Sequence, residues 1–291
     1  RLTGRWTIDP STVSITGLYN TAANDLSWNR DVLAAAGIPE EKLPPLRHSY
    51  EAVGRIRREV ALELGLAEDC MVLCGGNDAV LAAYSGGSTD PGMINNVCGT
   101  CEITSVWTDR PVASPNFNVR CHVLPGRWLT FFVLNTGGKA LEWFHSVFCR
   151  DMSEREFYES YVPSVLERFF YGGDADRWEA RLPEYVPFLG GSRYSLELKK
   201  AAFDGVTLET TREDMLLALI RGNARYHGEH LREVGRLVRL GRKVVTTGGG
   251  ASIRGFIEAK RRWTGDFDYE YQEQSSLAGA ARLGQVYLSQ S

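Results

Sequence analysis

Cysteine is scarce in this chain, and strong charge and long apolar runs are missing. Six cysteines in 291 residues are too few for a disulfide scaffold and fit a reducing compartment, so we expect a cytoplasmic protein. The net charge of −3 predicts no general attraction to nucleic acid or to an anionic membrane. No apolar run approaches the roughly 18 residues of a membrane-spanning helix, and we expect no secretory signal. The chain opens on Arg1 rather than on methionine, and we expect that an N-terminal part precedes it.

Two groups of potential metal ligands are each incomplete. Cys98 and Cys101 form a C-x-x-C pair without the second pair of a zinc ribbon, which favours small buried residues around a turn over metal or redox chemistry. His227 and His230 lie three residues apart in a predicted helix, but no third ligand can be placed. A partly buried or solvated histidine pair is therefore favoured, and no metal ligand is assigned.

What is present is an ordinary globular composition, 43% hydrophobic and 24% charged. The most informative segment covers residues 71–78, where a short apolar run predicts a buried strand and two glycines turn the chain into a helix. Asp78 would stand at that helix's N-terminus, where the macrodipole favours its charged form. A charged carboxylate with room beside it can act as a general base. An ordinary N-cap aspartate is the alternative.

The character of the chain changes near residue 70. Residues 1–70 are predicted to be mostly helical, with helices at 29–36 and 56–64, and to lack a strand-rich core of their own. The remainder alternates strands and helices. Its predicted strands are 71–74, 93–98, 102–107, 119–124, 128–134, 186–189, 243–247 and 268–271, and its main helices are 139–148, 154–170, 212–238, 251–263 and 274–288.

Three glycine-rich turns share one physical property. They are Gly99-Thr100 in a predicted hairpin, Gly137-Gly138 at a helix start, and Gly248-Gly249-Gly250 between a strand and a helix. Glycine is needed where no Cβ fits between backbone and ligand, and the N–H groups of helix starts attract anions. Together the turns could cradle a nucleotide. Each glycine-rich turn, taken alone, could equally be an ordinary turn or helix cap. None of the three is followed by the Lys-Ser/Thr of a Walker A motif.

Several segments resemble a known family, in order and over nearly the whole chain. They are residues 1–4 with Ile8, Asp9 and Ser11, then 75–78, 98–100, 122–128, 135–144, 185–193, 201–206 and 248–251. This pattern is similar to the C-terminal portion of the FGGY carbohydrate kinases, the group that includes xylulokinases, ribulokinases, gluconokinases and glycerol kinases.

The resemblance implies the two-lobed actin-like, ribonuclease-H-like ATPase fold, an α/β architecture with a mixed sheet flanked by helices. Residues 1–70 would be the tail of the N-terminal, sugar-binding lobe, and residues 71–291 the C-terminal, nucleotide-binding lobe. The implied reaction transfers the γ-phosphoryl group of ATP, with Mg²⁺, to a hydroxyl of a sugar or polyol. Such a reaction needs mainly positioning and charge neutralisation.

The resemblance also implies roles for individual residues. Asp78 falls on the general base, and Ala79 lies beside it at a position that can touch the sugar. The implied nucleotide contacts are Gly99 and Thr100 at the β- and γ-phosphates, Gly138 and Glu142 near the nucleotide, and Gly249, Gly250, Ala251 and Arg254 on the adenosine side.

Three residues depart from the family's pattern: Cys101, Arg221 and Arg254. The family's own phosphate loop, and most of its sugar-contacting and metal-coordinating residues, precede the position of Arg1. A catalytically inactive nucleotide-binding or interaction module is therefore the alternative to a kinase. We expect a small-molecule sugar or polyol as partner, first of all a five-carbon ketose or a sugar acid, and neither nucleic acid nor membrane. A homodimer is left open.

Overall fold

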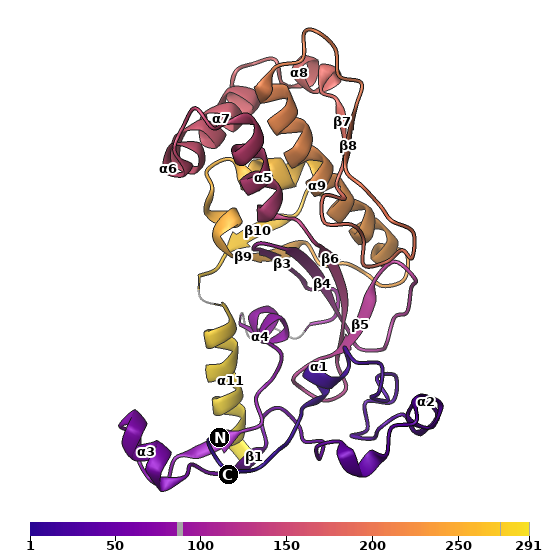
Figure 1. The fold of residues 1–291 in the computed structure, drawn as a ribbon, viewed down its shortest axis with the longest axis vertical. Coiled ribbons are helices and arrows are strands. Elements are labelled where there is room, and N and C mark those ends of the chain that lie inside the picture. The colour runs from indigo at the N-terminus through magenta and orange to yellow at the C-terminus, as the bar shows by residue number, and fades with distance from the viewer. Residues whose placement is uncertain (86–89, 274, 291) are drawn as a thin grey trace.

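The computed structural model describes residues 1–85, 90–273 and 275–290. Figure 1 shows an elongated molecule with a sheet at its centre, a group of helices above the sheet, and the N-terminal segment and both chain ends below it. This is the predicted α/β architecture, a mixed sheet with helices on both faces. None of the described helices is long and apolar enough to cross a membrane.

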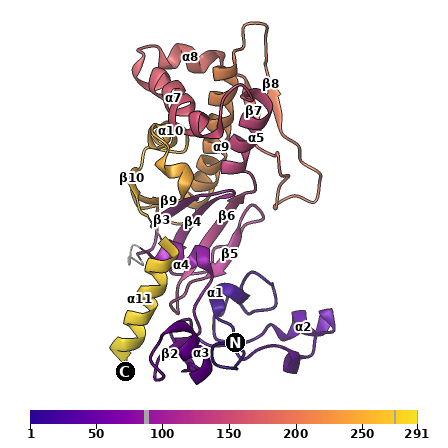
Figure 2. The same ribbon diagram turned by 60° about the vertical axis from the view of Figure 1, so that its left-hand side comes forward.

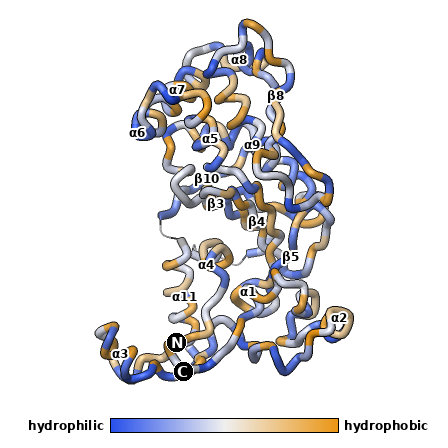
Figure 3. The backbone as a smooth tube through the Cα atoms, viewed as in Figure 1, coloured by the Kyte–Doolittle hydropathy of each residue, from blue (hydrophilic) through white to orange (hydrophobic). Residues whose placement is uncertain are grey.

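The central sheet combines parallel and antiparallel strands. In spatial order they are β10 (Asp268–Tyr271), β9 (Lys243–Thr247), β3 (Ile94–Cys98), β4 (Glu102–Thr108), β6 (Trp128–Leu134) and β5 (Asn118–Cys121). β10, β9 and β3 run parallel, whereas the pairs β3–β4, β4–β6 and β6–β5 are antiparallel. Every residue of β6 is buried, as expected for a strand covered on both faces. Figure 3 shows hydrophobic residues along β4.

The upper face of the sheet supports a helical layer built around α9 (Arg212–Gly235). Leu231 and Val234 of α9 pack against Ile94 and Phe132 of the sheet. The other helices of this layer are α5 (Gly138–Phe148), α6 (Glu154–Glu156), the π-helix η2 (Phe157–Tyr161), α7 (Val162–Tyr171), α8 (Ala175–Arg181) and α10 (Phe256–Trp263). The predicted helix 154–170 is thus α6, η2 and α7 in succession.

Two helices cover the opposite face, α4 (Asp78–Tyr84) and α11 (Ser275–Gln290), which lie side by side in Figures 1 and 2. Val80 and Leu81 of α4 pack with Trp107 and Leu129 of the sheet. The crossing with α11 is close because Gly279 has no side chain, and a Cβ there would lie 2.0 Å from the carbonyl oxygen of Leu81. The predicted closing helix is confirmed, although its first predicted residue, Gln274, lies outside the described residues.

The N-terminal segment differs from the prediction of a mostly helical region. It contains short helices at α1 (Pro10–Val13), α2 (Arg30–Ala36), η1 (Glu40–Lys42) and α3 (Arg58–Leu64), and irregular backbone elsewhere. It also contributes β1 (Ala52–Arg55), which pairs with β2 (Met71–Leu73). Helices of three to seven residues have little stability of their own, so tertiary contacts decide the conformation here.

Other predicted elements are shifted. The predicted helix 251–263 is instead the 3-10 turn η3 (Gly249–Ser252) followed by α10, because Gly255, with φ of 90°, interrupts the helical path. The predicted strand at 186–189 is β7 (Glu184–Val186), which pairs with β8 (Ala202–Asp204).

The histidine pair of α9 is not solvated. His227 and His230 are 0% and 3% exposed, because both face the sheet, where they contact the ring of Phe132. Among the described residues no group of three or more His, Cys, Asp or Glu side chains could hold a metal ion. Cys98 and Cys101 are free thiols at the β3–β4 turn; Cys98 is buried, as expected, whereas Cys101 is partly exposed.

Candidate functional site

An open groove of about 790 Å³ lies between the ends of the central strands and the upper helices. Three segments that are distant in sequence meet in it: the β3–β4 hairpin, the start of α5, and the turn after β9. The predicted nucleotide-binding residues that line it are Gly99, Thr100, Gly138, Glu142, Gly249, Gly250 and Arg254. Tyr158, Glu159 and Pro163, from the helices after α5, complete the opposite wall.

The hairpin is fixed to the start of α5. Gly138 and Lys139 donate their N–H groups to the carbonyl oxygens of Gly99 (2.9 Å) and Thr100 (3.1 Å). A Cβ at Gly138 would lie 2.8 Å from the Gly99 oxygen, so only glycine permits this approach. These two N–H groups therefore hold the hairpin in place. Gly138, Leu141 and Glu142 of α5 line the groove.

The turn after β9 brings a second glycine pair to the same groove. Gly248 has φ of 90°, and a Cβ there would lie 2.6 Å from the Cys98 carbonyl oxygen, so the turn is pressed against the end of β3. Gly249 and Gly250 then begin the short helix η3. The first N–H groups of a helix have no partner within it, and here they lie at the wall of the groove, where an anion can accept from them.

Three predicted site residues do not line the groove. Ala251 is 5% exposed and packs inward beneath η3. Asp78 and Ala79 begin α4, on the opposite face of the sheet from α5 and α9. Asp78 is exposed, and its Oδ1 accepts a hydrogen bond from the N–H of Ala79 at 2.8 Å. Asn77, not Asp78, is the N-cap of α4, which leaves the Asp78 carboxylate in the first turn of the helix and open to solvent.

The turn that carries Asp78 is braced by the N-terminal segment. Gly75 donates its N–H to the carbonyl oxygen of Ser49, and Asn77 donates its N–H to Ser11 Oγ, both at 2.9 Å. The carboxylate of Asp9, which is 3% exposed, accepts from the hydroxyls of Ser11 (2.5 Å) and Ser49 (2.7 Å). The buried carboxylate of Asp9 thus holds the Ser11 hydroxyl in place, and that hydroxyl holds the turn before Asp78.

A buried ion pair lies beneath the hairpin. Glu102 opens β4, Lys260 lies on α10, and the two side chains are in contact although they are only 5% and 4% exposed. Asn96 Nδ2 donates to Glu102 Oε1 at 3.0 Å, and His227 Nε2 lies 3.8 Å from Oε2. Burial alone would raise the pKa of Glu102, but the charge of Lys260, with His227 and these hydrogen bonds, lowers it to about 2.

This pair supports the groove indirectly. The backbone of Glu102 abuts Gly137, where a Cβ would lie 2.7 Å from the Glu102 nitrogen. Lys260 and Glu102 also border a small cavity of about 30 Å³ that Gly138 and Gly250 share. The ion pair therefore lies under two of the three glycine turns.

Sequence reasoning did not identify Asp9, Ser11, Glu102 or Lys260 as site residues. Glu102 could have been noted as a charge at the first position of a strand that is otherwise apolar or hydroxylated. Lys260 could have been noted beside Ala259, on the face of α10 that the spacing of Phe256 and Trp263 predicts to be inward.

The three residues that depart from the family's pattern all form surface or structural contacts in this fold. Arg254 forms an exposed ion pair with Glu167 at 2.8 Å, at the rim of the groove. Arg221 is buried among acceptors of the upper helical layer, away from the groove lining. Cys101 donates its thiol to the carbonyl oxygen of Asn135 at 3.2 Å, which adds a further tie between hairpin and α5 entry.

Comparison with known proteins identifies relatives of both parts of the chain. Residues 1–85 match the model of the FGGY family of carbohydrate kinases, N-terminal domain. The autoinducer-2 kinase of Photorhabdus laumondii subsp. laumondii is 29% identical over 171 residues, which cover 57% of this chain and 32% of that protein. The chain thus spans about a third of the length of the curated relatives that it matches.

Solved structures share the fold over the full length of this chain. A ligand-bound xylulose kinase and a gluconate kinase, both from Lactobacillus acidophilus, superpose with TM-scores of 0.84 at 20% and 19% identity. Each match covers 100% of this chain and 57% of the other. The chain therefore has the actin-like, ribonuclease-H-like fold of these kinases, and its first 85 residues match the N-terminal domain of the FGGY carbohydrate kinases.

Proposed function

We propose that this chain is the nucleotide-binding part of a kinase that transfers the γ-phosphoryl group of ATP to a hydroxyl of a sugar or polyol. One observation carries the proposal: three glycine turns, far apart in sequence, meet in one groove that is large enough for a nucleotide. The names of the relatives agree with this reaction class, since they are an autoinducer-2 kinase, a xylulose kinase and a gluconate kinase.

In this proposal the triphosphate lies between the Gly99–Thr100 hairpin and the Gly249–Gly250 turn. Backbone N–H groups and the Thr100 hydroxyl would bind phosphate oxygens there. These donors would stabilise the charge that is distributed over the phosphoryl oxygens in the transition state. The ties from the hairpin to α5 hold the donors in position before ATP arrives, so little reorganisation is needed during the reaction.

Asp78 is the proposed general base. It would accept the proton of the attacking hydroxyl, while Ala79 beside it leaves room for the sugar. The carboxylate is exposed and stands in the first turn of α4, so it is accessible to a substrate. The brace from Asp9 and Ser11 fixes the turn from which it projects.

Magnesium enters this proposal only as the ion that accompanies ATP. The described residues offer no cluster of three carboxylate, histidine or cysteine ligands. Magnesium retains most of its water and is usually held through substrate phosphates and one or two carboxylates.

The proposal is tested with the full-length protein that contains this chain. We expect ATP-dependent phosphorylation of at least one member of a panel of ketoses, aldonates, polyols and autoinducer-2, measured by coupled ADP release. Asp78→Asn should lower kcat by about 10²- to 10⁴-fold, the usual contribution of a general base, and leave the melting temperature unchanged. Asp31→Asn is a matched control, because Asp31 is also an exposed aspartate in the first turn of a helix.

Two outcomes would contradict the proposal in different ways. If Asp78→Asn kept near-normal turnover, the assignment of the base would be wrong. If calorimetry showed ATP binding but no acceptor gave ADP release, the chain would be an inactive nucleotide-binding module instead of a kinase.

A further inference from the structure

Arg120 is a buried cation that the fold does not neutralise. It lies on β5, it is 6% exposed, and its guanidinium carbon is 4.0 Å from the centre of the Phe131 ring. In the part of the chain that the structure describes, its Nε has no hydrogen-bond partner, and the guanidinium joins no ion pair. Burial lowers its pKa, which reflects the cost of removing the charge from water.

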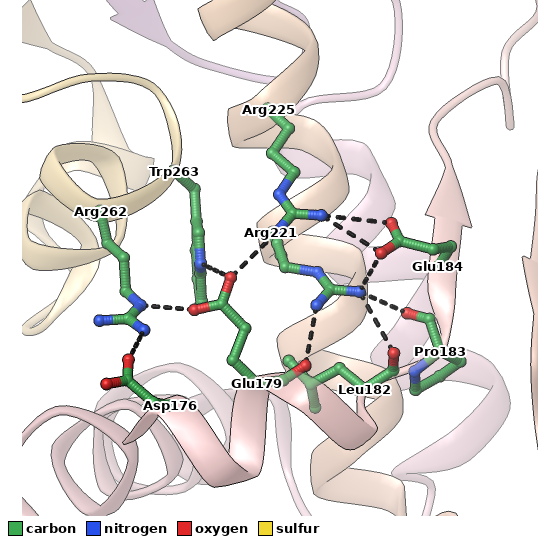
Figure 4. Close-up of polar contacts among 9 residues, drawn as sticks. All are labelled: Asp176, Glu179, Leu182, Pro183, Glu184, Arg221, Arg225, Arg262 and Trp263. Atoms are coloured by element: carbon green, nitrogen blue, oxygen red, sulfur yellow. Dashed lines mark hydrogen bonds and ion pairs between the residues drawn. The ribbon is translucent and has the colours of Figure 1, made fainter. Parts of the chain in front are cut away.

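Arg221 is a second buried arginine, and its guanidinium has hydrogen-bond and ion-pair partners within the fold. It is 2% exposed, and apart from its Nε the guanidinium is paired, as Figure 4 shows. Its acceptors are the carbonyl oxygens of Glu179 (3.1 Å), Leu182 (3.3 Å) and Pro183 (3.1 Å) and the carboxylate of Glu184 (2.9 Å). Arg120 has the same burial with none of these partners, so packing alone does not account for its charge.

The position of Arg120 connects it with the proposed base. The chain that leaves β5 passes directly beneath the turn before Asp78, since a Cβ at Gly76 would lie 2.6 Å from Val123 Cγ1. The neighbouring residue, Cys121, donates its N–H to Ser14 Oγ, on the segment that also supplies the brace. Arg120 is thus built into the same corner of the molecule as Asp78.

The charges that act on Arg120 leave this corner positive. They come from Arg193, which opposes its charge, and from Asp78 and Tyr194, which favour it. Arg193 is held by Asn135, to whose Oδ1 its Nε donates at 2.5 Å. Asp78 is the one carboxylate among the groups that act on the charge of Arg120, whereas Arg193 adds a second positive charge, so a further anion would complete the balance.

We propose that Arg120 binds an oxyanion beside Asp78, which is either an acidic group carried by the acceptor sugar or the phosphoryl group during transfer. This inference rests on the proposed function, and it names a substrate-binding residue that the family resemblance did not assign. Both sources present the same chemistry, since a guanidinium binds carboxylate and phosphate oxygens through paired N–H groups. The contact with the Phe131 ring holds the group in place before the anion arrives.

Steady-state kinetics of Arg120→Met distinguish the two sources. The variant keeps an apolar stem on Phe131 and removes the charge. If the anion belongs to the sugar, acidic acceptors such as aldonates and sugar phosphates should be preferred over matched polyols, and the variant should raise KM for the acids at least about tenfold. If the anion is the phosphoryl group, kcat should fall about 10²-fold for every acceptor with KM for ATP unchanged. Parameters within about twofold of the wild type for all acceptors overturn the proposal.

A second measurement does not depend on turnover. Because Arg120 is unpaired, Arg120→Met should melt at the wild-type temperature or above it. Arg221→Met is the matched control, and it should melt lower because four hydrogen bonds are lost. Inorganic phosphate should raise the melting temperature of the wild type more than that of Arg120→Met. A variant that melts well below the wild type and responds equally to phosphate would show that Arg120 is structural, whether or not the protein is a kinase.

Discussion

Breaking the buried pair of Glu102 and Lys260 should destabilise the fold by a calculable amount. The pair and the Asn96 hydrogen bond lower the pKa of Glu102 from 4.5 to about 2. At about 1.4 kcal/mol per pKa unit, this shift corresponds to roughly 3 kcal/mol. Removal of one partner of a buried ion pair typically costs about 3–5 kcal/mol, because the remaining charge is uncompensated. We therefore expect Lys260→Met to lower the free energy of unfolding by about 3 kcal/mol.

The double variant Glu102→Gln/Lys260→Met measures how strongly the two charges stabilise each other, apart from their contacts with other residues. Glu102→Gln leaves Lys260 buried without its anion and should cost a similar amount, about 3 kcal/mol. In the double variant neither charge remains, so its loss should fall short of the sum of the single losses by about 2–3 kcal/mol. Urea unfolding followed by circular dichroism measures all three values. ATP affinity should fall in both single variants, because Glu102 and Gly137 abut at the base of the hairpin.

Additivity would refute this reasoning. If the two single losses summed to the double loss within about 0.5 kcal/mol, the charges would not be coupled. Single losses below about 1 kcal/mol would show that water reaches the pair and that it behaves like an ion pair on the surface.

Three further predictions follow from contacts around the site. Acid should destabilise the protein between pH 6.5 and 4, because burial lowers the pKa of His227 to about 4 and that of His230 to about 3. The unfolded chain binds their protons first, so each should cost about 2 kcal/mol at pH 5, and melting curves from pH 8 to 5 should show a loss that His230→Phe reduces. Ser11→Ala removes the acceptor of the Asn77 amide, so hydrogen exchange at that amide should become faster and turnover should fall about tenfold. Ser49→Ala also removes a hydroxyl that donates to Asp9, but it should change neither the exchange rate nor turnover. Equal behaviour of the two serine variants would contradict the brace. Gly248→Ala should lower stability by about 1–3 kcal/mol and weaken ATP binding, as measured by thermal unfolding and calorimetry, because a side chain cannot fit against the end of β3 at positive φ.

Features that depend on neighbouring residues were predictable from the sequence. The β-branched run before Gly248, the apolar run before Gly75 and the hairpin at Gly99 each carry their own signal, and each forms at the predicted place. The prediction that the run before Gly75 is a buried strand is wrong, because β2 forms a two-stranded sheet with β1 and its residues are exposed or half-buried. The meeting of the glycine turns followed from the family resemblance and from the rule that glycine allows close approach. Seven of the eight predicted nucleotide-binding residues line one groove.

Features that depend on partners far along the chain were not predictable. Glu102 and Lys260 are 158 residues apart, and neither sequence neighbourhood indicates that the other exists. The same holds for Asp9 and Ser49, whose contact decides how the Asp78 turn is held. The partners of the N–H groups at the start of α5 were likewise not predictable, since the carbonyl groups that accept from them belong to the β3–β4 hairpin.

A structure of the full-length protein with a nonhydrolysable ATP analogue and an acceptor sugar tests the central claim most directly. The account predicts the phosphates between Gly99–Thr100 and Gly249–Gly250, with a sugar hydroxyl within about 3 Å of the Asp78 carboxylate. A nucleotide bound outside this groove, or an Asp78 carboxylate that faces away from both ligands, would contradict it.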